Sequence, residues 1–297
     1  MRILILGGTS FVGRAIVEEL LRRAHDVTLF GRGRTGPELF PGVERRTGDR
    51  STGDYSALAD GRWDGVVDVS AYVPRHVGQA MDAVADRVGR YLFISTGSVY
   101  DYKQAPAYLD EDCPRLEPRR DTEQWNGPAY GALKVACEDD VLARLGDRAT
   151  IVRPGIVAGP HDPSDRFTYW VRAAAGGGRI EVPGRLAQPI QVVDADDLAV
   201  LVVSLLERDR PRAYNAVGRS MPFEDLVRAC SPLDLELVEV AEGRAPMLVA
   251  DPAVDVMFTR SAARAHAAGM PQTPLEETAA KVRAWDVARG EPPLNTW

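Results

Sequence analysis

The chain has 297 residues, of which 45% are hydrophobic and 27% are charged, as in an ordinary globular protein. Its net charge is −7, with an isoelectric point near 5.3. This balance disfavours a general nucleic-acid binder and gives no reason to expect binding to an anionic membrane surface. The length allows one large domain or two modest ones.

The cysteines, the histidines and the apolar runs bear on three further questions: disulfide bonds, metal sites and membrane spans. The three cysteines are odd in number and far apart in sequence, which predicts free thiols in a reducing compartment. The four histidines show no metal-ligand spacing, so we expect no metal site. The first apolar run is too short for a signal peptide or a membrane span, which needs roughly 18 residues or more. We therefore expect a soluble, cytoplasmic protein with no membrane partner.

The first thirty residues predict one strand–helix–strand unit. Residues 3–6 form an apolar run that ends at Gly7 and Gly8, which predicts a strand buried on both faces. Apolar residues then recur at helical spacing over 12–24, with charged residues between them. Residues 26–30 (DVTLF) predict the second strand.

The alternation continues to about residue 154 and predicts an α/β fold, a doubly wound parallel sheet of the Rossmann type. Further strands are predicted at 65–69, 90–95 and 149–153, and helices at 77–88, 130–145 and 197–207. Later patterns predict a smaller C-terminal substrate-binding lobe with helices near 223–230 and 274–289 and a strand at 236–240. We assign residues 1–158 and about 189–215 to the dinucleotide-binding domain, and about 159–188 and 216–297 to the lobe. A long loop at 101–128 is expected to be functional.

A glycine-rich loop, GGTSFVG, lies between the first strand and its helix. In this setting, helix N-terminal amides bind a dinucleotide pyrophosphate, and glycines let the backbone approach it. Ser10 stands where many such loops have their middle glycine. The predicted phosphate-binding residues are Gly7, Thr9, Ser10, Phe11, Val12 and Gly13.

The end of the second strand predicts the cofactor. An acidic residue there would bind the ribose 2′-hydroxyl of NAD, but the sequence reads FGRGR. Arg32 and Arg34 would instead hold a 2′-phosphate, which favours NADP over the alternative, NAD. Alternatively, both are solvated loop arginines that bind no ligand. Asp49, followed by Arg50, is placed to meet the adenine edge.

The segment YGALK places Tyr130 and Lys134 four residues apart, on one face of a predicted helix. A lysine ammonium beside a phenol favours the phenolate and brings its pKa closer to neutrality. The pair therefore predicts a tyrosine that gives or takes a proton.

Together these motifs resemble the extended short-chain dehydrogenase/reductases, the group that includes nucleotide-sugar epimerases and dehydratases. The resemblance rests on GGTSFVG, the GD at 48–49, ISTGSVY at 94–100, YGALK, VRPG at 152–155 with GP at 159–160, and QVVDADDLA at 191–199. The chain looks most like a bacterial reductase-like branch that is similar to chloroplast RNA-binding relatives.

The resemblance implies roles for particular residues. Tyr130 would be the general acid/base, and Lys134 would bind the nicotinamide ribose. Thr96 would hydrogen-bond the reacting oxygen, with Ser98 as the second choice. Other residues implied near the cofactor are Ser70, Ala71, Pro154 and Val157.

One departure from the family pattern limits the reaction. Sugar dehydratases of the family carry an Asp-Glu pair directly after the threonine, but this chain has Gly97 and Ser98. The acid and base for water elimination are therefore missing, which argues against dehydration. The arginines suited to NADP argue mildly against epimerases, which usually retain NAD.

The substrate side is predicted from the residues around the expected pocket. His161 is either a second acid/base or a loop hydrogen-bonding residue, and Arg166 pairs either with an anionic substrate or with nearby aspartates. The candidate substrate residues are Tyr72, Ser98, Tyr100, Trp125, His161, Arg166 and Tyr169.

The main hypothesis is an NADP-dependent oxidoreductase that moves a hydride between nicotinamide and a carbonyl, alcohol or imine carbon of a small metabolite. One alternative is a sugar or nucleotide-sugar epimerase with retained NAD. The other is a non-catalytic, cofactor-sensing or RNA-binding member of the same fold. We expect a small-molecule partner and no nucleic acid, and dimerisation would be common in the family.

Overall fold

The computed structural model describes residues 1–105, 108–208 and 212–295. Its centre is a seven-stranded sheet in which every neighbouring pair is parallel, in the order β11-β6-β5-β4-β1-β2-β3. The strands are β1 (Arg2–Leu6), β2 (Asp26–Gly31), β3 (Glu44–Thr47), β4 (Trp63–Asp68), β5 (Val88–Ile94), β6 (Ala149–Pro154) and β11 (Ala213–Ala216). The predicted fold class, a doubly wound Rossmann sheet, is confirmed.

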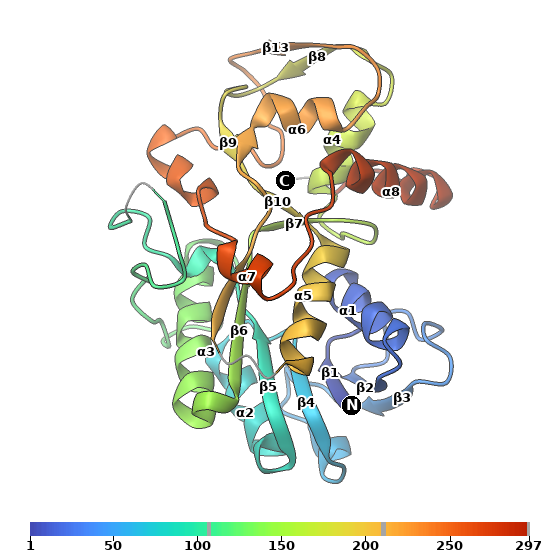
Figure 1. Ribbon diagram of the computed structural model, residues 1–297, viewed down its shortest axis with the longest axis vertical. Helices are drawn as coiled ribbons and strands as arrows, with labels where there is room; N and C mark the ends of the chain where they lie inside the picture. Colours follow the sequence, from blue (N-terminus) through green and yellow to red (C-terminus); the bar gives the residue numbers. More distant parts are fainter. Residues whose placement is uncertain (106–107, 209–211, 296–297) are drawn as a thin grey trace.

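Helices cover both faces of this sheet (Figure 1). On one face α1 (Phe11–Arg22) and α5 (Ala195–Glu207) pack against Ile3 and Ile5; on the other, α2 (Pro74–Val84) and α3 (Tyr130–Leu145) pack against Leu4 and Leu6. Alternate residues of β1 therefore enter opposite cores, and all four side chains are at most 1% exposed. Each aliphatic side chain buried in this way contributes roughly 1.5–3 kcal/mol of stability.

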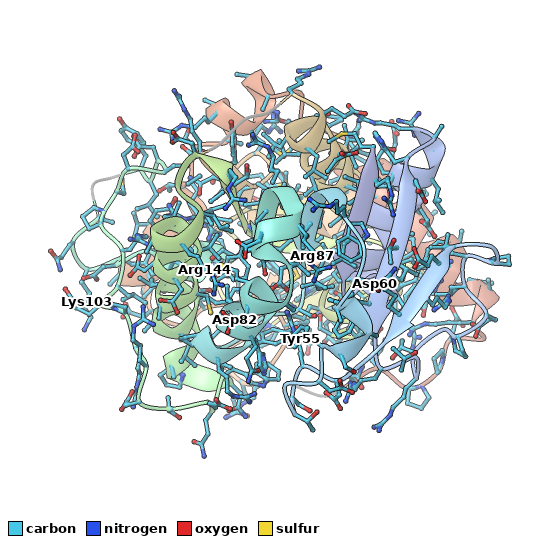
Figure 2. All side chains as sticks on the ribbon, turned by 90° about the horizontal axis from the view of Figure 1, so that it is seen from below. Tyr55, Asp60, Asp82, Arg87, Lys103 and Arg144 are labelled. Atoms are coloured by element: carbon cyan, nitrogen blue, oxygen red, sulfur yellow. The ribbon has the colours of Figure 1, made fainter. Side chains whose placement is uncertain are left out.

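Helices α2 and α3 also meet at their outer surface. Arg144 of α3 forms a 2.5 Å ion pair with Asp82 of α2, and both are labelled in the view of Figure 2. Both side chains are exposed, so this pair contributes at most about 1 kcal/mol. The buried residues Cys137, Val141 and Leu145 of α3 hold the helix to the sheet.

The strand order reverses at β1, which lies between β2 and β4. In an open parallel sheet, the loops at such a reversal separate and leave a crevice at the carboxyl ends of the strands. The chain leaves β1 at Leu6 and enters α1 at Phe11, so the glycine-rich loop lies at this position.

A second group of elements lies beyond the carboxyl edge of the sheet, above it in Figure 1. These elements share a core around the buried Trp170 and Phe223. They are α4 (Arg166–Ala174), β8 (Gly178–Val182), α6 (Phe223–Ala229), β13 (Leu235–Glu239) and α8 (Leu275–Ala288). Ala265 and Met270, by contrast, pack in the core of the sheet. The domain boundaries proposed above remain a prediction.

Small pairs of strands connect the two parts. β7 (Ile156–Ala158) pairs with β10 (Val192–Asp194), and β9 (Pro189–Ile190) pairs with β12 (Met221–Pro222). The remaining short elements are α7 (Ala263–Ala267) and 3₁₀ turns at Ser56–Leu58, Ala85–Arg87, Gly97–Val99, Gly127–Ala129, Gly146–Arg148 and Pro252–Phe258.

The predicted elements agree with the observed ones to within a few residues, and the α3 bounds coincide. The pattern missed β8, β11, α4, α7 and the short pairs β7–β10 and β9–β12. All three cysteines are free thiols, as expected. Within the described parts of the chain, no helix is long and apolar enough to cross a membrane.

Candidate active site

The glycine-rich loop has a backbone path that only glycine can follow at two positions. Gly7 has φ +98°, a conformation that residues with a Cβ rarely adopt. A Cβ at Gly13 would lie 2.0 Å from the carbonyl oxygen of Gly7. Glycine at 13 therefore lets the first turn of α1 pack directly on the loop.

The N-terminus of α1 is suited to an anion. Ser10 occupies the N-cap position with extended backbone angles, but its side chain caps no amide, and the first turn contains no acidic residue. The first amides of a helix have no partner within the helix and carry the positive end of its dipole. A pyrophosphate would satisfy these donors.

A cavity of about 510 Å³ opens beside this loop, at the reversal point of the sheet. Eight of the predicted cofactor residues line it: Gly7, Thr9, Ser10, Arg32, Arg34, Asp49, Arg50 and Ser70. Glycines in the loop, an open helix N-terminus and a groove of this size together fit a dinucleotide.

The remaining predicted cofactor residues lie outside the lining of this cavity, and their contact with a cofactor stays a prediction. Val12 and Val157 pack in the core of the sheet, and Gly13 supports the loop from behind. The others are Phe11, Ala71, Lys134 and Pro154; Ala71 and Lys134 are each at most 1% exposed.

Five arginines line the cavity, and three of them are committed elsewhere. Arg46 pairs with Glu44 and Asp60, Arg45 donates to the Leu39 carbonyl, and Arg50 pairs with Asp68. Arg32 and Arg34 are exposed and make no hydrogen bond or ion pair with any described residue. Arg32 and Arg34 therefore lie at the end of β2 without an ion-pair partner among the described residues, and no acidic residue stands at this end of the strand.

Asp49 belongs to the same corner of the cavity. It accepts hydrogen bonds from the Ser51 hydroxyl (2.6 Å) and amide (2.9 Å), which lower its pKa. The positive charges of Arg32 and Arg34 lower it further. Asp49 thus stays ionised beside the two arginines.

Arg50 forms the floor of the cavity through a buried ion pair. Its guanidinium binds both oxygens of Asp68, at 2.8 and 3.0 Å, and also reaches the Ser70 hydroxyl at 3.2 Å. Asp68 is fully buried and accepts a further hydrogen bond from Tyr91 at 2.7 Å. Burial and the neighbouring carboxylate raise the Tyr91 pKa well above its usual value. Sequence reasoning placed Arg50 at the site but missed Asp68.

The predicted catalytic residues converge at the N-terminus of α3. Thr96 follows β5, accepts a hydrogen bond from the Ser98 amide at 3.1 Å, and donates to the Ser98 hydroxyl at 3.3 Å. Tyr130 starts α3 and shares a side-chain hydrogen bond with Thr96. Glycine at position 131 lets the two segments approach closely, since a Cβ there would lie 2.1 Å from the Ser98 carbonyl oxygen. Both candidate hydroxyls therefore lie together beside the phenol.

The expected effect of Lys134 on Tyr130 is not found. Burial raises the Tyr130 pKa to about 12; the hydrogen bond with Thr96 opposes this shift, and Lys134 is not among its main causes. Lys134 instead donates to the carbonyls of Ile94 (2.6 Å) and Ala71 (2.9 Å). Residues i and i+4 share a helix face, but here the long lysine side chain turns toward the strand ends.

Lys134 is a buried cation that pairs with no carboxylate among the described residues. Its side chain is 1% exposed, and burial lowers its pKa to about 8. The ammonium lies 4.2 Å from the centre of the Phe93 ring, within cation–π range. Its two hydrogen bonds leave one of three N–H donors free for another acceptor.

Two of the predicted substrate residues wall the cofactor cavity. Tyr72 and Trp125 both line it and stack at a centroid distance of 4.5 Å. Tyr72 also lies 6.5 Å from the Tyr130 ring, which connects the cavity to the catalytic residues. His76 lines the same cavity, and its enclosed Nδ1 has no hydrogen-bond partner among the described residues. The sequence offered no signal for His76 beyond its residue type.

Tyr100 does not belong to the pocket. It is fully buried, donates to Asn215 at 2.7 Å, and accepts from Arg153 at 2.9 Å. Burial raises its pKa to about 12. Its aromatic side chain fills the junction of β6 and β11, so the expectation of substrate contact is replaced by a structural role.

His161, Tyr169 and Arg166 are spread over different places. His161 packs edge-on against Trp285 at 5.3 Å, and Tyr169 lines a separate cavity of about 1010 Å³ beside Gly184. Neither meets Tyr130. Arg166 bonds Ser164 at 3.0 Å and is near enough to lower the Tyr130 pKa by its charge. Of these three candidates, only Arg166 lies by the catalytic residues.

The sequence model of the NAD dependent epimerase/dehydratase family matches residues 3–217, which contain β1 to β11, the cavity and Tyr130. The chain belongs to this family. Members of the family are NAD-dependent enzymes of the oxidoreductase type, and the predicted resemblance is thereby confirmed.

A curated relative of this family member is the chloroplast stem-loop binding protein of 41 kDa b from Arabidopsis thaliana. The two are 25% identical over 248 residues, which are 77% of this chain. The chain spans 62% of the length of that relative.

Solved structures of the same fold include enzymes bound to NAD. The Bordetella bronchiseptica enzyme WbmH in complex with NAD⁺ aligns with a TM-score of 0.70 and 21% identity, over 97% of this chain and 99% of that one. The dTDP-glucose 4,6-dehydratase from Bacillus anthracis in complex with NAD aligns with a TM-score of 0.72 and 16% identity, over 98% of each chain. At these identities the likeness shows the fold alone.

Proposed function

We propose that the protein is an NADP-dependent oxidoreductase that transfers a hydride between nicotinamide and a carbonyl, alcohol or imine carbon of a small metabolite. The observation that carries the cofactor choice is the pair Arg32 and Arg34, exposed at the cavity and free of ion pairs with described residues. Asp49 lies near both guanidinium groups but is bonded to Ser51, so a 2′-phosphate would accept the charge-assisted hydrogen bonds that Arg32 and Arg34 do not make with it.

The dinucleotide would be held by groups already named. The loop amides and the N-terminus of α1 would bind its pyrophosphate, and Arg32 with Arg34 would bind the 2′-phosphate. The bound nicotinamide supplies or accepts the hydride. The remaining N–H donor of Lys134 would bind a ribose hydroxyl.

Tyr130 is suited to the reducing direction. A phenol with a pKa of about 12 is protonated at neutral pH, the state required of a general acid. In the reduction of a carbonyl, Tyr130 would give its proton to the oxygen as the bound reduced cofactor supplies the hydride to the carbon. Thr96 would hydrogen-bond the same oxygen and orient it. In the oxidising direction, by contrast, the raised pKa of Tyr130 disfavours the phenolate that would take the proton from an alcohol.

Cofactor binding tests the proposal directly. Trp125 lines the cavity, so its fluorescence should change when NADPH or NADH is titrated into the cofactor-stripped protein. We expect tighter binding of NADPH, and about 10–100-fold weaker NADPH binding in Arg32→Ala, because a charge-assisted hydrogen bond contributes roughly 1.5–3 kcal/mol. Binding of NADH should be unchanged. Arg62→Ala, which removes an exposed arginine outside the cavity, is the matched control.

The epimerase reading is the second candidate, and the family that matches the chain favours it. An epimerase would retain NAD through purification and would give no net change in absorbance at 340 nm with its substrate. Preference for NADH, or NAD that cannot be removed from the protein, would place this function first.

A non-catalytic role is the third outcome. The relative from Arabidopsis is named for stem-loop binding, but the charge of −7 offers this chain little attraction for nucleic acid. Tyr130→Phe separates the two classes: an enzyme should lose about 10²–10⁴-fold in turnover while keeping its cofactor affinity. Function unaffected by this change would favour a binding protein.

A further inference from the structure

Arg260 is a buried cation next to the catalytic threonine. Its side chain lies between two glycines at the carboxyl ends of β5 and β6. A Cβ built on Gly97 would meet its Nη1 at 1.6 Å, and a Cβ built on Gly155 would meet its Nη2 at 3.3 Å. Gly97 directly follows Thr96, and Gly155 directly follows Pro154. The guanidinium therefore fills the volume that a side chain at position 97 would take.

The surroundings of Arg260 do not neutralise its charge. The residue is 6% exposed, and its enclosed Nε has no hydrogen-bond partner. Its backbone is fixed by Gln191, which accepts from the Arg260 amide at 3.0 Å and donates to its carbonyl at 2.8 Å. Among the residues that the structure describes, no carboxylate pairs with the guanidinium, and the titratable groups beside it are the phenols of Tyr102 and Tyr100, whose raised pKa values keep them neutral at pH 7. Burial without a counter-charge lowers the Arg260 pKa.

A buried guanidinium without a counter-charge destabilises the folded chain unless a bound anion supplies that charge. Leaving a buried charge without a partner destabilises a protein by several kcal/mol. Other buried arginines of this chain have carboxylate partners, as Arg153 has Glu138 and Arg50 has Asp68. A position that departs from this pattern beside a catalytic group is a candidate for ligand binding.

We propose that Arg260 binds a carboxylate of the substrate, within a few bonds of the carbonyl that Tyr130 protonates. This inference rests on the proposed function and names its substrate class: small oxo acids and the corresponding hydroxy acids. One guanidinium balances one negative charge and binds a carboxylate through two parallel hydrogen bonds. The distance along the substrate is short because Thr96, which holds the reacting oxygen, and Gly97, which Arg260 contacts, are adjacent residues.

Gly97 is the second part of this site. In the dehydratases that the chain resembles, an acidic residue follows the threonine, and its side chain would occupy this volume. Here glycine leaves the volume to a cation from the distant segment at 260. The chain thus exchanges a negative group for a positive one beside the reacting oxygen.

The test uses oxamate, a small carboxylate next to an amide carbonyl, and its neutral analogue oxamide. The protein is first titrated with NADP⁺ by calorimetry, and oxamate is then titrated into the NADP⁺-saturated protein, in which Arg32 and Arg34 are occupied. We expect oxamate to bind and oxamide not to bind. Arg260→Met should weaken oxamate binding at least tenfold and leave NADP⁺ binding unchanged. Arg62→Met, which removes an exposed arginine that lines no cavity with Arg260, should change neither.

The outcomes separate the two proposals. Failure of NADP⁺ to bind contradicts the proposed function, and oxamate titrated into cofactor-free protein then still reports on Arg260. Oxamate that does not bind the wild-type protein, or binds Arg260→Met equally well, overturns the inference. Binding of inorganic phosphate in preference to oxamate overturns the choice of a carboxylate. Thermal unfolding guards against a purely structural role: Arg260→Met should be at least as stable as the wild type, whereas clear destabilisation would contradict ligand binding.

Discussion

Two regions at the carboxyl end of the sheet treat buried cations in opposite ways. Arg153 binds both oxygens of the fully buried Glu138, at 2.8 and 3.0 Å, and also donates to Tyr100. Lys134 and Arg260, nearer to Thr96, are equally buried but pair with no described carboxylate. The first region contains its own counter-charge and holds the chain together. The second leaves positive charge available to molecules that enter the site.

The largest expected effect comes from breaking the paired region. Arg153→Met should lower the free energy of unfolding by about 3–5 kcal/mol, because Glu138 would stay buried with only Arg115 to balance it. Urea denaturation measures this change. Arg144→Met is the matched control, since its ion pair with Asp82 is exposed and should contribute less than about 1 kcal/mol. Equal effects of the two variants would show that burial of the Arg153 pair does not matter.

The second prediction concerns Lys134 and the dependence of stability on pH. Its pKa is lowered from 10.5 to about 8 in the folded chain. Between these values the unfolded chain holds a proton that the folded chain has released, so the contribution of Lys134 to stability should rise with pH from about 8 toward 10. The buried thiols of Cys137 and Cys230 act in the opposite direction near pH 9, because burial raises their pKa values and unfolding then releases their protons. The full shift corresponds to roughly 3 kcal/mol. Above pH 10 the raised pKa of Tyr91 acts in the opposite direction, because unfolding then releases its proton.

Unfolding measured from pH 7 to 10 in the wild type and in Lys134→Met checks this. The wild type should gain stability relative to the variant over the window, because Cys137 and Cys230 are present in both chains and only Lys134 differs. A wild-type profile as flat as that of the variant would mean that Lys134 is not titrating in the folded protein.

The sequence could predict the parts of the site whose positions depend on short spacings along the chain. The glycine loop, Thr96, Tyr130 and Lys134 were found because short spacings along the chain fix them at strand ends and on one helix face. The fold followed from the alternation of apolar runs with helical patterns. β11 was missed because its four residues, AYNA, lack a strong apolar pattern.

The remaining predictions failed because they depend on side-chain contacts between segments that are distant in sequence. Tyr100 follows the catalytic turn in sequence, but its phenol turns inward to Arg153 and Asn215. The direction of the Lys134 side chain depends on carbonyls at 71 and 94, which no spacing within α3 reveals. Arg260 gave no signal at all, because its meaning depends on two glycines that are distant in sequence.

The smallest predicted effect tests whether Gly97 and Arg260 share one volume. Gly97→Ala should cost about 1–3 kcal/mol in the wild type, because the new Cβ would displace a guanidinium that lies 1.6 Å away. In an Arg260→Ala background the volume is free, so the same change should cost under about 0.5 kcal/mol. The difference between the two costs is the coupling of a double-mutant cycle, which is expected only for residues in contact. Gly78→Ala is the control: it lies in α2 with no atom near its Cβ position, and alanine should stabilise the helix by about 0.5–1 kcal/mol in both backgrounds. Coupling indistinguishable from zero would place the Arg260 guanidinium away from Gly97 and remove the basis for a cation beside the reacting oxygen.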